Sequence, residues 1–177
     1  MLVEFGGKKP RIHKTAFIHP TATLIGDVTI GAHSSVWPGA VVRADFESIT
    51  ISRYTCIQDN AVVHAGDRYE EKGEKGPRYL PVKIGNYVIV GHNALIHGCT
   101  VEDNCIVGGG SIVFNGARVR SGSLVGLGAV VPHDMEVAPK TIVVGIPARP
   151  LRALTDEELK GIRMQAENYA KLAKRYR

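Results

Sequence analysis

Residues 101–143 read VEDNCIVGGGSIVFNGARVRSGSLVGLGAVVPHDMEVAPKTIV and place a valine at every sixth position. The same period extends towards the N-terminus through Ile, Val and Leu. It slips by three residues after Val42, is interrupted after Val63, and shortens by one residue before Val101. The twenty positions are Ile12, Ile18, Leu24, Ile30, Val36, Val42, Ile51, Ile57, Val63, Ile84, Val90, Ile96, Val101, Val107, Val113, Val119, Val125, Val131, Val137 and Val143.

The residues between these positions suit a strand that turns sharply after each hexad. A small residue comes four places after most of the aliphatics, as at Ala16 and Ala94, and glycine follows several directly, as in Ile30-Gly31. The aliphatic side chain would fill an interior, the small residue a crowded corner, and glycine a tight turn. This hexapeptide pattern is typical of left-handed parallel β-helices, in which three hexads close a triangular coil. We therefore predict a mainly β domain of about seven coils over residues 1–150.

Composition excludes several other classes of protein. The chain of 177 residues has 20 Val and 15 Ile against 10 Leu, a bias towards β-branched side chains that favours strands over a helical bundle. Its 20 glycines lack the three-residue period of collagen. No apolar run approaches the roughly 20 residues of a membrane span, and the N-terminus lacks the apolar segment of a signal peptide. We expect a cytoplasmic protein with no membrane partner.

Charge and cysteine content narrow the partners further. The net charge is +5, but residues 149–177 hold eight Lys/Arg and four Asp/Glu, so most of the excess lies there. The rest of the chain offers no basic stripe for a phosphate backbone, which argues against nucleic-acid binding. Cys56, Cys99 and Cys105 include no CxxC pair. We expect them to be reduced, inert thiols at packing positions.

Two segments lie outside the repeat. Residues 66–81 (GDRYEEKGEKGPRYLP) are polar and glycine-rich, and we expect a loop that projects from the prism. Residues 151–177 have helical periodicity, and Thr155 and Glu158 have the spacing of a capping box. The apolar face of that helix would consist of Leu159, Ile162, Ala166, Tyr169, Leu172 and Tyr176. We expect this helix to pack on the prism or on a neighbouring subunit.

The hexad count places two histidines in one column. His64 directly follows Val63, and His97 directly follows Ile96. These aliphatic positions are three hexads apart, which is one full coil, so the two histidines should stack on adjacent coils. By the same count Arg43, which follows Val42, should lie one coil below His64.

A second polar column should form on another edge of the prism. His92 comes two residues after Val90, and Asp59 comes two residues after Ile57, with Gln58 beside it. Catalytic zinc sites commonly use three imidazoles at about 2.1 Å and an open water position. One prism cannot bring its two edges together, but a cyclic trimer can pair one edge with the other edge of a neighbour. We therefore predict a homotrimer with three metal sites between its subunits.

The set Arg43-x-Asp45, Gln58-Asp59-Asn60, His64 and Gly91-His92-x4-His97-Gly98 on a hexapeptide prism resembles the gamma-class carbonic anhydrase family over residues 10–155. The resemblance implies that His64 and His97 of one subunit and His92 of the next bind Zn²⁺, or Fe²⁺ or Co²⁺ in its place. It also implies that Gln58 hydrogen-bonds the metal-bound water. Arg43, Asp45 and Asp59 would form interfacial ion pairs that position the site.

The reaction implied by the resemblance is the reversible hydration of CO2 to bicarbonate by a metal-bound hydroxide. A proton must then reach the solvent, and in the family glutamates directly after the Arg-x-Asp motif and on the acidic loop carry it. Here Phe46 follows Asp45 and cannot carry a proton. Glu70, Glu71 and Glu74 are the candidates left on the loop. We therefore expect CO2 hydration to be slow.

Three other functions fit the same prism. Hexapeptide acyltransferases bind acyl-CoA between subunits and use a histidine as general base, and residues 145–149 (GIPAR) suit either group. A metal-dependent CoA-thioester hydrolase would be a close variant. A non-catalytic trimeric metal-binding scaffold, as a subunit of a larger assembly, is the third. The three histidines favour a metal site over a single general base.

Overall fold

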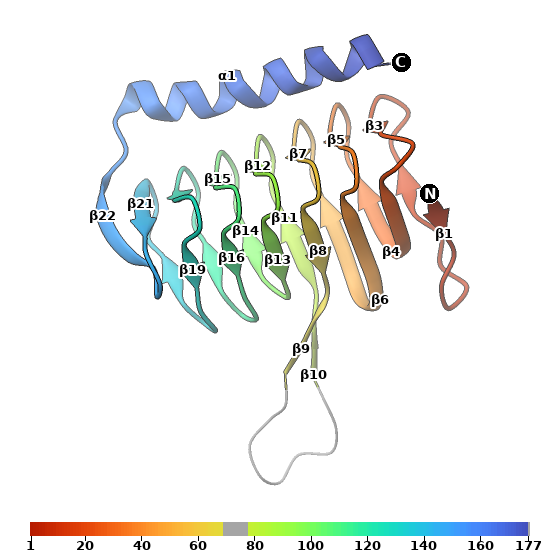
Figure 1. The fold of residues 1–177 in the computed structure, drawn as a ribbon, viewed down its shortest axis with the longest axis horizontal. Helices are drawn as coiled ribbons and strands as arrows, with labels where there is room; N and C mark the ends of the chain where they lie inside the picture. The colour runs from red at the N-terminus through yellow and green to blue at the C-terminus, as the bar shows by residue number, and fades with distance from the viewer. Residues whose placement is uncertain (69–77, 177) are drawn as a thin grey trace, which may run out of the picture.

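The computed structural model describes residues 1–68 and 78–176, and it consists of a prism of stacked parallel strands with one helix along its side (Figure 1). The prediction of a mainly β, left-handed parallel β-helix of about seven coils is confirmed. Eighteen of the twenty hexad aliphatics are buried in one continuous core. The other two, Ile12 and Ile18, are only partly buried because they belong to the first coil, at the end of the prism.

The strands lie on three faces, which we name the polar face, the helix-covered face and the histidine face. The polar face contains β2 (Arg11–Ile12), the second halves of β4 (Thr23–Ile30) and β6 (Val41–Ile51), β11 (Val82–Ile84), β14 (Thr100–Val101), β17 (Arg118–Val119) and β20 (Glu136–Val137). The helix-covered face contains β3 (Phe17–Ile18), β5 (Ser35–Val36), β7 (Cys56–Ile57), β12 (Ile89–Val90), β15 (Ile106–Val107), β18 (Leu124–Val125) and β21 (Thr141–Val144). The histidine face contains β1 (Leu2–Val3), the first halves of β4 and β6, β8 (Val62–His64), β13 (Leu95–His97), β16 (Ile112–Val113) and β19 (Val130–Val131).

Strand β6 absorbs the three-residue slip in the repeat. It continues from the histidine face to the polar face without a turn, and its hexad positions Val42 and Ile51 are both buried. The extra residues fall between them, and Asp45 and Phe46 belong to this stretch. The slip therefore places two additional side chains at the edge of the histidine face.

The segment expected as a projecting loop begins and ends as a two-stranded antiparallel ribbon. Strand β9 (Gly66–Arg68) pairs with β10 (Arg78–Leu80), with Asp67 opposite Tyr79, and the ribbon points away from the prism (Figure 1). Glu70, Glu71 and Glu74, the candidate proton carriers, lie outside the described residues.

The C-terminal segment contains a strand before its helix. Strand β22 (Arg149–Ala153) pairs antiparallel with β21, so the first residues of the segment with helical periodicity are extended. Helix α1 (Asp156–Ala173) follows, with the predicted capping box of Thr155 and Glu158, and a short 3-10 turn η1 (Lys174–Tyr176) ends the described chain. Of the predicted apolar face, Leu159, Ile162, Ala166, Tyr169 and Leu172 all pack against the prism.

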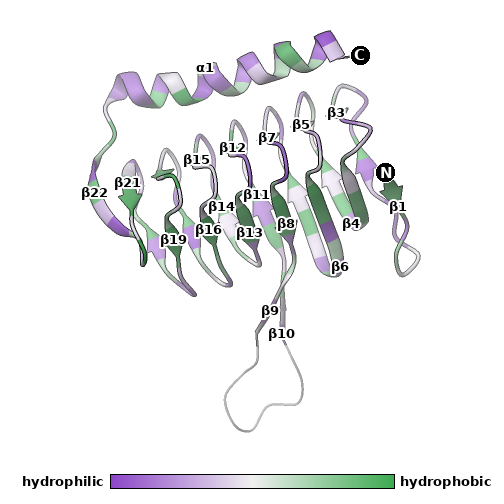
Figure 2. Cartoon of the chain, in the orientation of Figure 1, coloured by the Kyte–Doolittle hydropathy of each residue, from purple (hydrophilic) through white to green (hydrophobic). Residues whose placement is uncertain are grey.

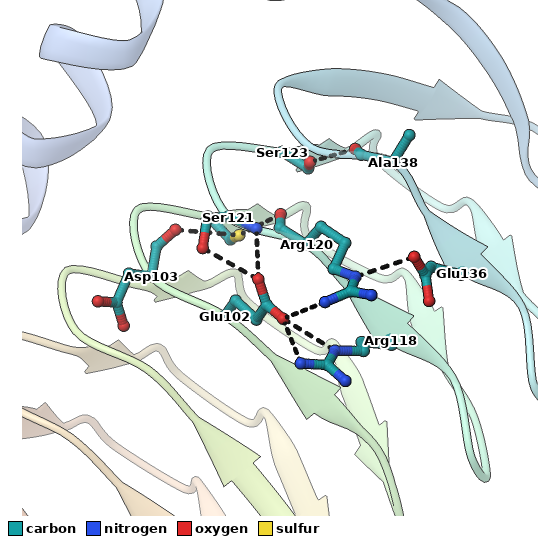
Figure 3. Close-up of polar contacts among 9 residues, drawn as sticks. Glu102, Asp103, Arg118, Arg120, Ser121, Ser123, Glu136 and Ala138 are labelled. Carbon is teal, nitrogen blue, oxygen red and sulfur yellow. Dashed lines mark hydrogen bonds and ion pairs between the residues drawn. The ribbon is translucent and has the colours of Figure 1, made fainter.

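The outer surfaces of the other two faces differ in polarity. On the polar face, the residue just before each interior aliphatic points outward and is polar: Arg11, Thr29, Thr50, Lys83, Thr100, Arg118 and Glu136. Figure 3 shows how Glu102 on this face accepts hydrogen bonds from Arg118, Arg120 and Ser121. On the histidine face the equivalent side chain is polar in β4, at Thr23, and apolar in the strands that follow: Val41, Val62, Leu95, Ile112 and Val130. Strands β13, β16 and β19 are green in Figure 2.

In the described part of the chain, no helix has the length and apolar character needed to cross a membrane.

Candidate metal centre

His64 and His97 lie on adjacent coils, as the hexad count predicts. In the parallel pairing of β8 with β13, His64 is directly opposite His97, and in the pairing of β6 with β8, Arg43 is opposite His64. The two imidazole rings have centroids 5.0 Å apart, and Nδ1 of His64 lies 3.0 Å from Nε2 of His97. The column therefore brings two ring nitrogens face to face.

The other ring nitrogen of His64 is held by a carboxylate. Nε2 of His64 lies 3.0 Å from Oδ1 of Asp45, and the second oxygen of Asp45 accepts a hydrogen bond from Arg43. Burial acts to raise the pKa of Asp45, but the hydrogen bonds from Arg43 and His64 outweigh it and lower that pKa. Burial also lowers the pKa of His64, against the opposing effect of the hydrogen bond with Asp45. The pair thus consists of an ionised carboxylate and a neutral imidazole near neutral pH.

The other ring nitrogen of His97 is held by an amide. Nδ1 of His97 donates to Oδ1 of Asn115 at 2.7 Å, and Nδ2 of Asn115 donates to the main-chain oxygen of Asp67. The ring of Phe114 stacks on His97, with centroids 4.8 Å apart. The His97 ring is therefore held by a hydrogen bond at its edge and by stacking on its face.

Two aromatic side chains form one wall beside His64. Phe46 from β6 stacks on Tyr79 from β10, with ring centroids 4.9 Å apart and planes 5° from parallel. The centroid of Phe46 is 5.7 Å from that of His64. Phe46, which directly follows Asp45, is therefore part of an apolar wall beside the site.

The second edge contains the remaining predicted residues. Nδ1 of His92 lies 3.1 Å from Oδ2 of Asp59, and the His92 side chain is 57% exposed. Gln58, at the end of β7, is buried. Within residues 1–68 and 78–176, no three His, Cys, Asp or Glu side chains are placed to hold a metal ion together. His92 of one chain therefore does not join the His64 and His97 of that same chain.

The chemistry of the histidine pair fits a metal ion. Metal-binding histidines usually donate their other ring N–H to a carboxylate or carbonyl oxygen, as His64 does to Asp45 and His97 to Asn115. This leaves lone pairs on the two nitrogens that face each other. Two nitrogens bound at about 2.1 Å to a tetrahedral metal are about 3.4 Å apart. The observed 3.0 Å is close to that separation, and a cation between the rings would relieve the repulsion of their lone pairs.

Sequence reasoning missed Asn115, Phe114 and Tyr79. The hexad count could have found the first two, because Phe114 follows Val113 as His97 follows Ile96. Asn115 occupies the next place, one coil above Gly98. No signal of this kind exists for Tyr79, which lies outside the repeat.

Comparison with known proteins finds relatives that match most of the chain. The family model for bacterial transferase hexapeptide (six repeats) matches residues 9–44. A probable carbonic anhydrase of Methanocaldococcus jannaschii is 48% identical, over 92% of this chain and 95% of that protein. Gamma carbonic anhydrase 2, mitochondrial, of Arabidopsis thaliana is 41% identical over 94% of this chain. The matched region spans 58% of the plant protein's length.

A solved structure shares the fold over the whole chain. A hexapeptide transferase family protein from Anaplasma phagocytophilum superposes with a TM-score of 0.90 at 37% identity, covering 100% of this chain and 98% of that one. The prism and its repeat define a hexapeptide-repeat protein. With the sequence relatives, they show that the chain belongs to the gamma-class carbonic anhydrase family, and its function is carbonic anhydrase-like at the level of that family.

Proposed function

We propose that this chain is a metal-dependent carbonic anhydrase that interconverts CO2 and bicarbonate at sites shared between the subunits of a homotrimer. The observation that carries the proposal is the facing pair of His64 and His97, whose outer ring nitrogens are both held by oxygen acceptors. His92 of a neighbouring subunit would supply the third imidazole. Zn²⁺, Fe²⁺ and Co²⁺ all accept such a donor set.

The polarity of the faces supports assembly through the histidine face. The helix-covered face has α1 on its apolar side chains. The outward side chains of the histidine face are apolar from Val41 to Val130, and they are not covered by α1. The edge that carries His92 also presents Leu127, 83% exposed, and Ile146, 76% exposed. Packing this edge of one subunit on the histidine face of the next would bury apolar surface on both and bring His92 to the histidine pair.

Each residue of the site has a role in this proposal. A bound cation of this kind acidifies water to a pKa of about 7 and so supplies hydroxide near neutral pH. Asp45, kept ionised by Arg43, accepts the Nε2 proton of His64 and fixes the orientation of that ring. Gln58 would hold the reacting water through its amide. Asp59 would orient His92, which it contacts at 3.1 Å.

The apolar wall of Phe46 and Tyr79 limits proton transfer beside His64. Neither ring carries a carboxylate that could accept a proton from the site and release it to solvent. We therefore expect proton transfer to limit the rate of CO2 hydration.

The proposal is tested by stopped-flow CO2 hydration on anaerobically purified protein loaded in turn with Zn²⁺, Co²⁺ and Fe²⁺. Hydration activity that depends on metal, with one metal per subunit and a trimeric mass in solution, would support it. Stoichiometric metal on a monomer would contradict the shared site. Absence of hydration with every metal would contradict the reaction while leaving a metal-binding scaffold.

Acyl transfer is the second candidate, because the matching family model describes bacterial transferases and the superposed structure is named a hexapeptide transferase family protein. An assay with acetyl-CoA and small amines or alcohols, run on metal-free protein, separates this reaction from hydration. Release of free thiol without an acceptor, only when metal is present, would instead indicate a CoA-thioester hydrolase.

A further inference from the structure

We propose that Asn115 is a positioning residue that holds His97 in its metal-binding orientation and links it to the base of the projecting ribbon of β9 and β10. This inference rests on the proposed metal site. Asn115 follows β16, one coil above His97, and its side chain is almost fully buried, with 4% of the residue exposed.

The amide of Asn115 has a defined orientation. Its Nδ2 donates to the main-chain oxygen of Asp67, which can only accept, so its Oδ1 must point the other way. That oxygen lies 2.7 Å from Nδ1 of His97. Since an amide oxygen can only accept, Nδ1 of His97 carries the hydrogen. The lone pair of the ring is then on Nε2, the nitrogen that faces His64 at 3.0 Å.

The surrounding backbone is shaped to admit this amide. A Cβ atom at Gly66 or at Gly98 would overlap Oδ1 of Asn115, and each would also lie 2.7 Å from the Cα of the other glycine. Gly98 has φ +51°, a conformation that side chains disfavour. Three backbone segments, those of β9, β13 and β16, therefore converge on one side chain.

The link gives the ribbon a direct connection to the site. Strand β9 contacts His97 through Asn115, and strand β10 contacts Phe46 through Tyr79. Loss of the Asn115 amide would free the His97 ring to rotate and to exchange its tautomer, and it would release β9 from the site. Outer partners of metal-binding histidines typically contribute 10–100-fold to metal affinity, as an order of magnitude.

The test measures Co²⁺ affinity by competition with a chelator, and the visible absorption of bound Co²⁺, for Asn115→Leu and Asn115→Asp. Leucine keeps the branched shape but removes the donor and the acceptor, and we expect roughly 10–100-fold weaker binding with an altered Co²⁺ spectrum. Aspartate keeps an acceptor for His97, and we expect it to restore most of the affinity. Asn168→Leu, at an exposed position on α1, is the matched control.

The outcomes separate this inference from the proposed function. If His97→Ala abolishes Co²⁺ binding but Asn115→Leu binds as wild type does, only the role of Asn115 is overturned. If His97→Ala itself binds Co²⁺ normally, the proposed metal site is wrong.

Because Asn115→Leu could fail to fold, a second measurement uses the wild-type protein. Nitrogen-15 NMR of metal-free, histidine-labelled protein should show the Nδ1–H tautomer for His97. An Nε2–H tautomer would overturn the inference.

Discussion

Nδ1 of His64 and Nε2 of His97 face each other at 3.0 Å, although the two residues are separated by 32 others along the chain, including the projecting ribbon. Their distance is set by the coil-to-coil pairing of β8 with β13 and by the hydrogen bonds to Asp45 and Asn115 that orient the two rings. Both strands belong to the rigid core, since Val63 and Ile96 are fully buried. The spacing of the two imidazoles is thus fixed before any ligand binds, which is the preorganisation that a metal site needs.

His92→Ala should abolish stoichiometric metal binding and leave the trimer intact. The side chain contributes the third imidazole in our proposal, and at 57% exposure it makes no core contact whose loss would unfold the prism. The affinity should fall by more than the roughly 10–100-fold expected for an outer partner. Metal content after dialysis and the mass in solution are the measurements, with His13→Ala, on the first coil, as control. Unchanged metal content in His92→Ala would refute the site.

Ile112→Glu should weaken the trimer. Ile112 points outward from β16 on the apolar histidine face, and burying a carboxylate against a neighbour is costly. We expect a smaller mass, dependent on protein concentration, in sedimentation experiments. Thr50→Glu places the same side chain at the equivalent strand position of the polar face and should leave the mass unchanged. Equal masses for the two variants would mean that the histidine face is not the interface.

Phe46→Glu should raise the turnover number for CO2 hydration at least about tenfold in weak buffer, with little change in KM. The ring of Phe46 is 5.7 Å from that of His64 and 48% exposed, so a carboxylate there could exchange protons with both the site and the solvent. Phe46→Gln, polar but unable to titrate in this range, is the control. An equal gain in both variants would show that removing the aromatic wall, and not proton transfer, causes the effect.

Glu102→Gln should lower the stability of the prism at neutral pH by about 1 kcal/mol or less, since water screens the group partly. Burial acts to raise the pKa of Glu102, but hydrogen bonds from Arg118, Ser121 and Arg120 outweigh it and lower the pKa to about 2, against an ordinary 4.5. Its contribution is therefore present above pH 4.5 and is lost as the pH falls towards about 2. Urea unfolding midpoints should converge for wild type and Glu102→Gln over that range. Glu4→Gln, which removes an exposed ion pair with Lys9, is the control and should change the midpoint little at neutral pH.

The three cysteines should resist thiol reagents in the folded protein. Burial raises the pKa of Cys56, Cys99 and Cys105 to about 12, so almost no thiolate forms at about pH 8. A colorimetric disulfide reagent should react with all three only in concentrated guanidinium. Rapid modification of the native protein would show that the prism opens locally around a cysteine.

The hexad period explains why so much of the fold could be predicted. A fixed number of residues per coil converts positions in the sequence into positions in space, and so the stacking of Arg43, His64 and His97 followed from counting. The same count placed Asp59 with His92, which the structure finds 3.1 Å apart. Whether these residues bind metal stays a prediction.

Features outside the hexad repeat could not be predicted by counting residues. Residues 151–153 have a helical pattern locally, yet they extend along β21, because its main-chain groups offer hydrogen bonds that local sequence does not reveal. The contact of Asn115 with Asp67 depends on where β9 leaves the prism, and the stack of Phe46 on Tyr79 depends on where β10 returns. Neither contact can be derived from the repeat, because β9 and β10 lie outside it.

The antiparallel strand β22 also limits the addition of other molecules at the end of the prism. A stack of parallel coils ends in strands with open hydrogen-bonding edges, onto which another molecule could add without limit. Here β22 occupies the edge of β21, and the turn at residues 145–148 satisfies Val130 on β19 through Gly145 and Ala148. Addition of another molecule at these two strands is thereby disfavoured. The proposed association through the histidine face would instead let a ring close at a finite number of subunits.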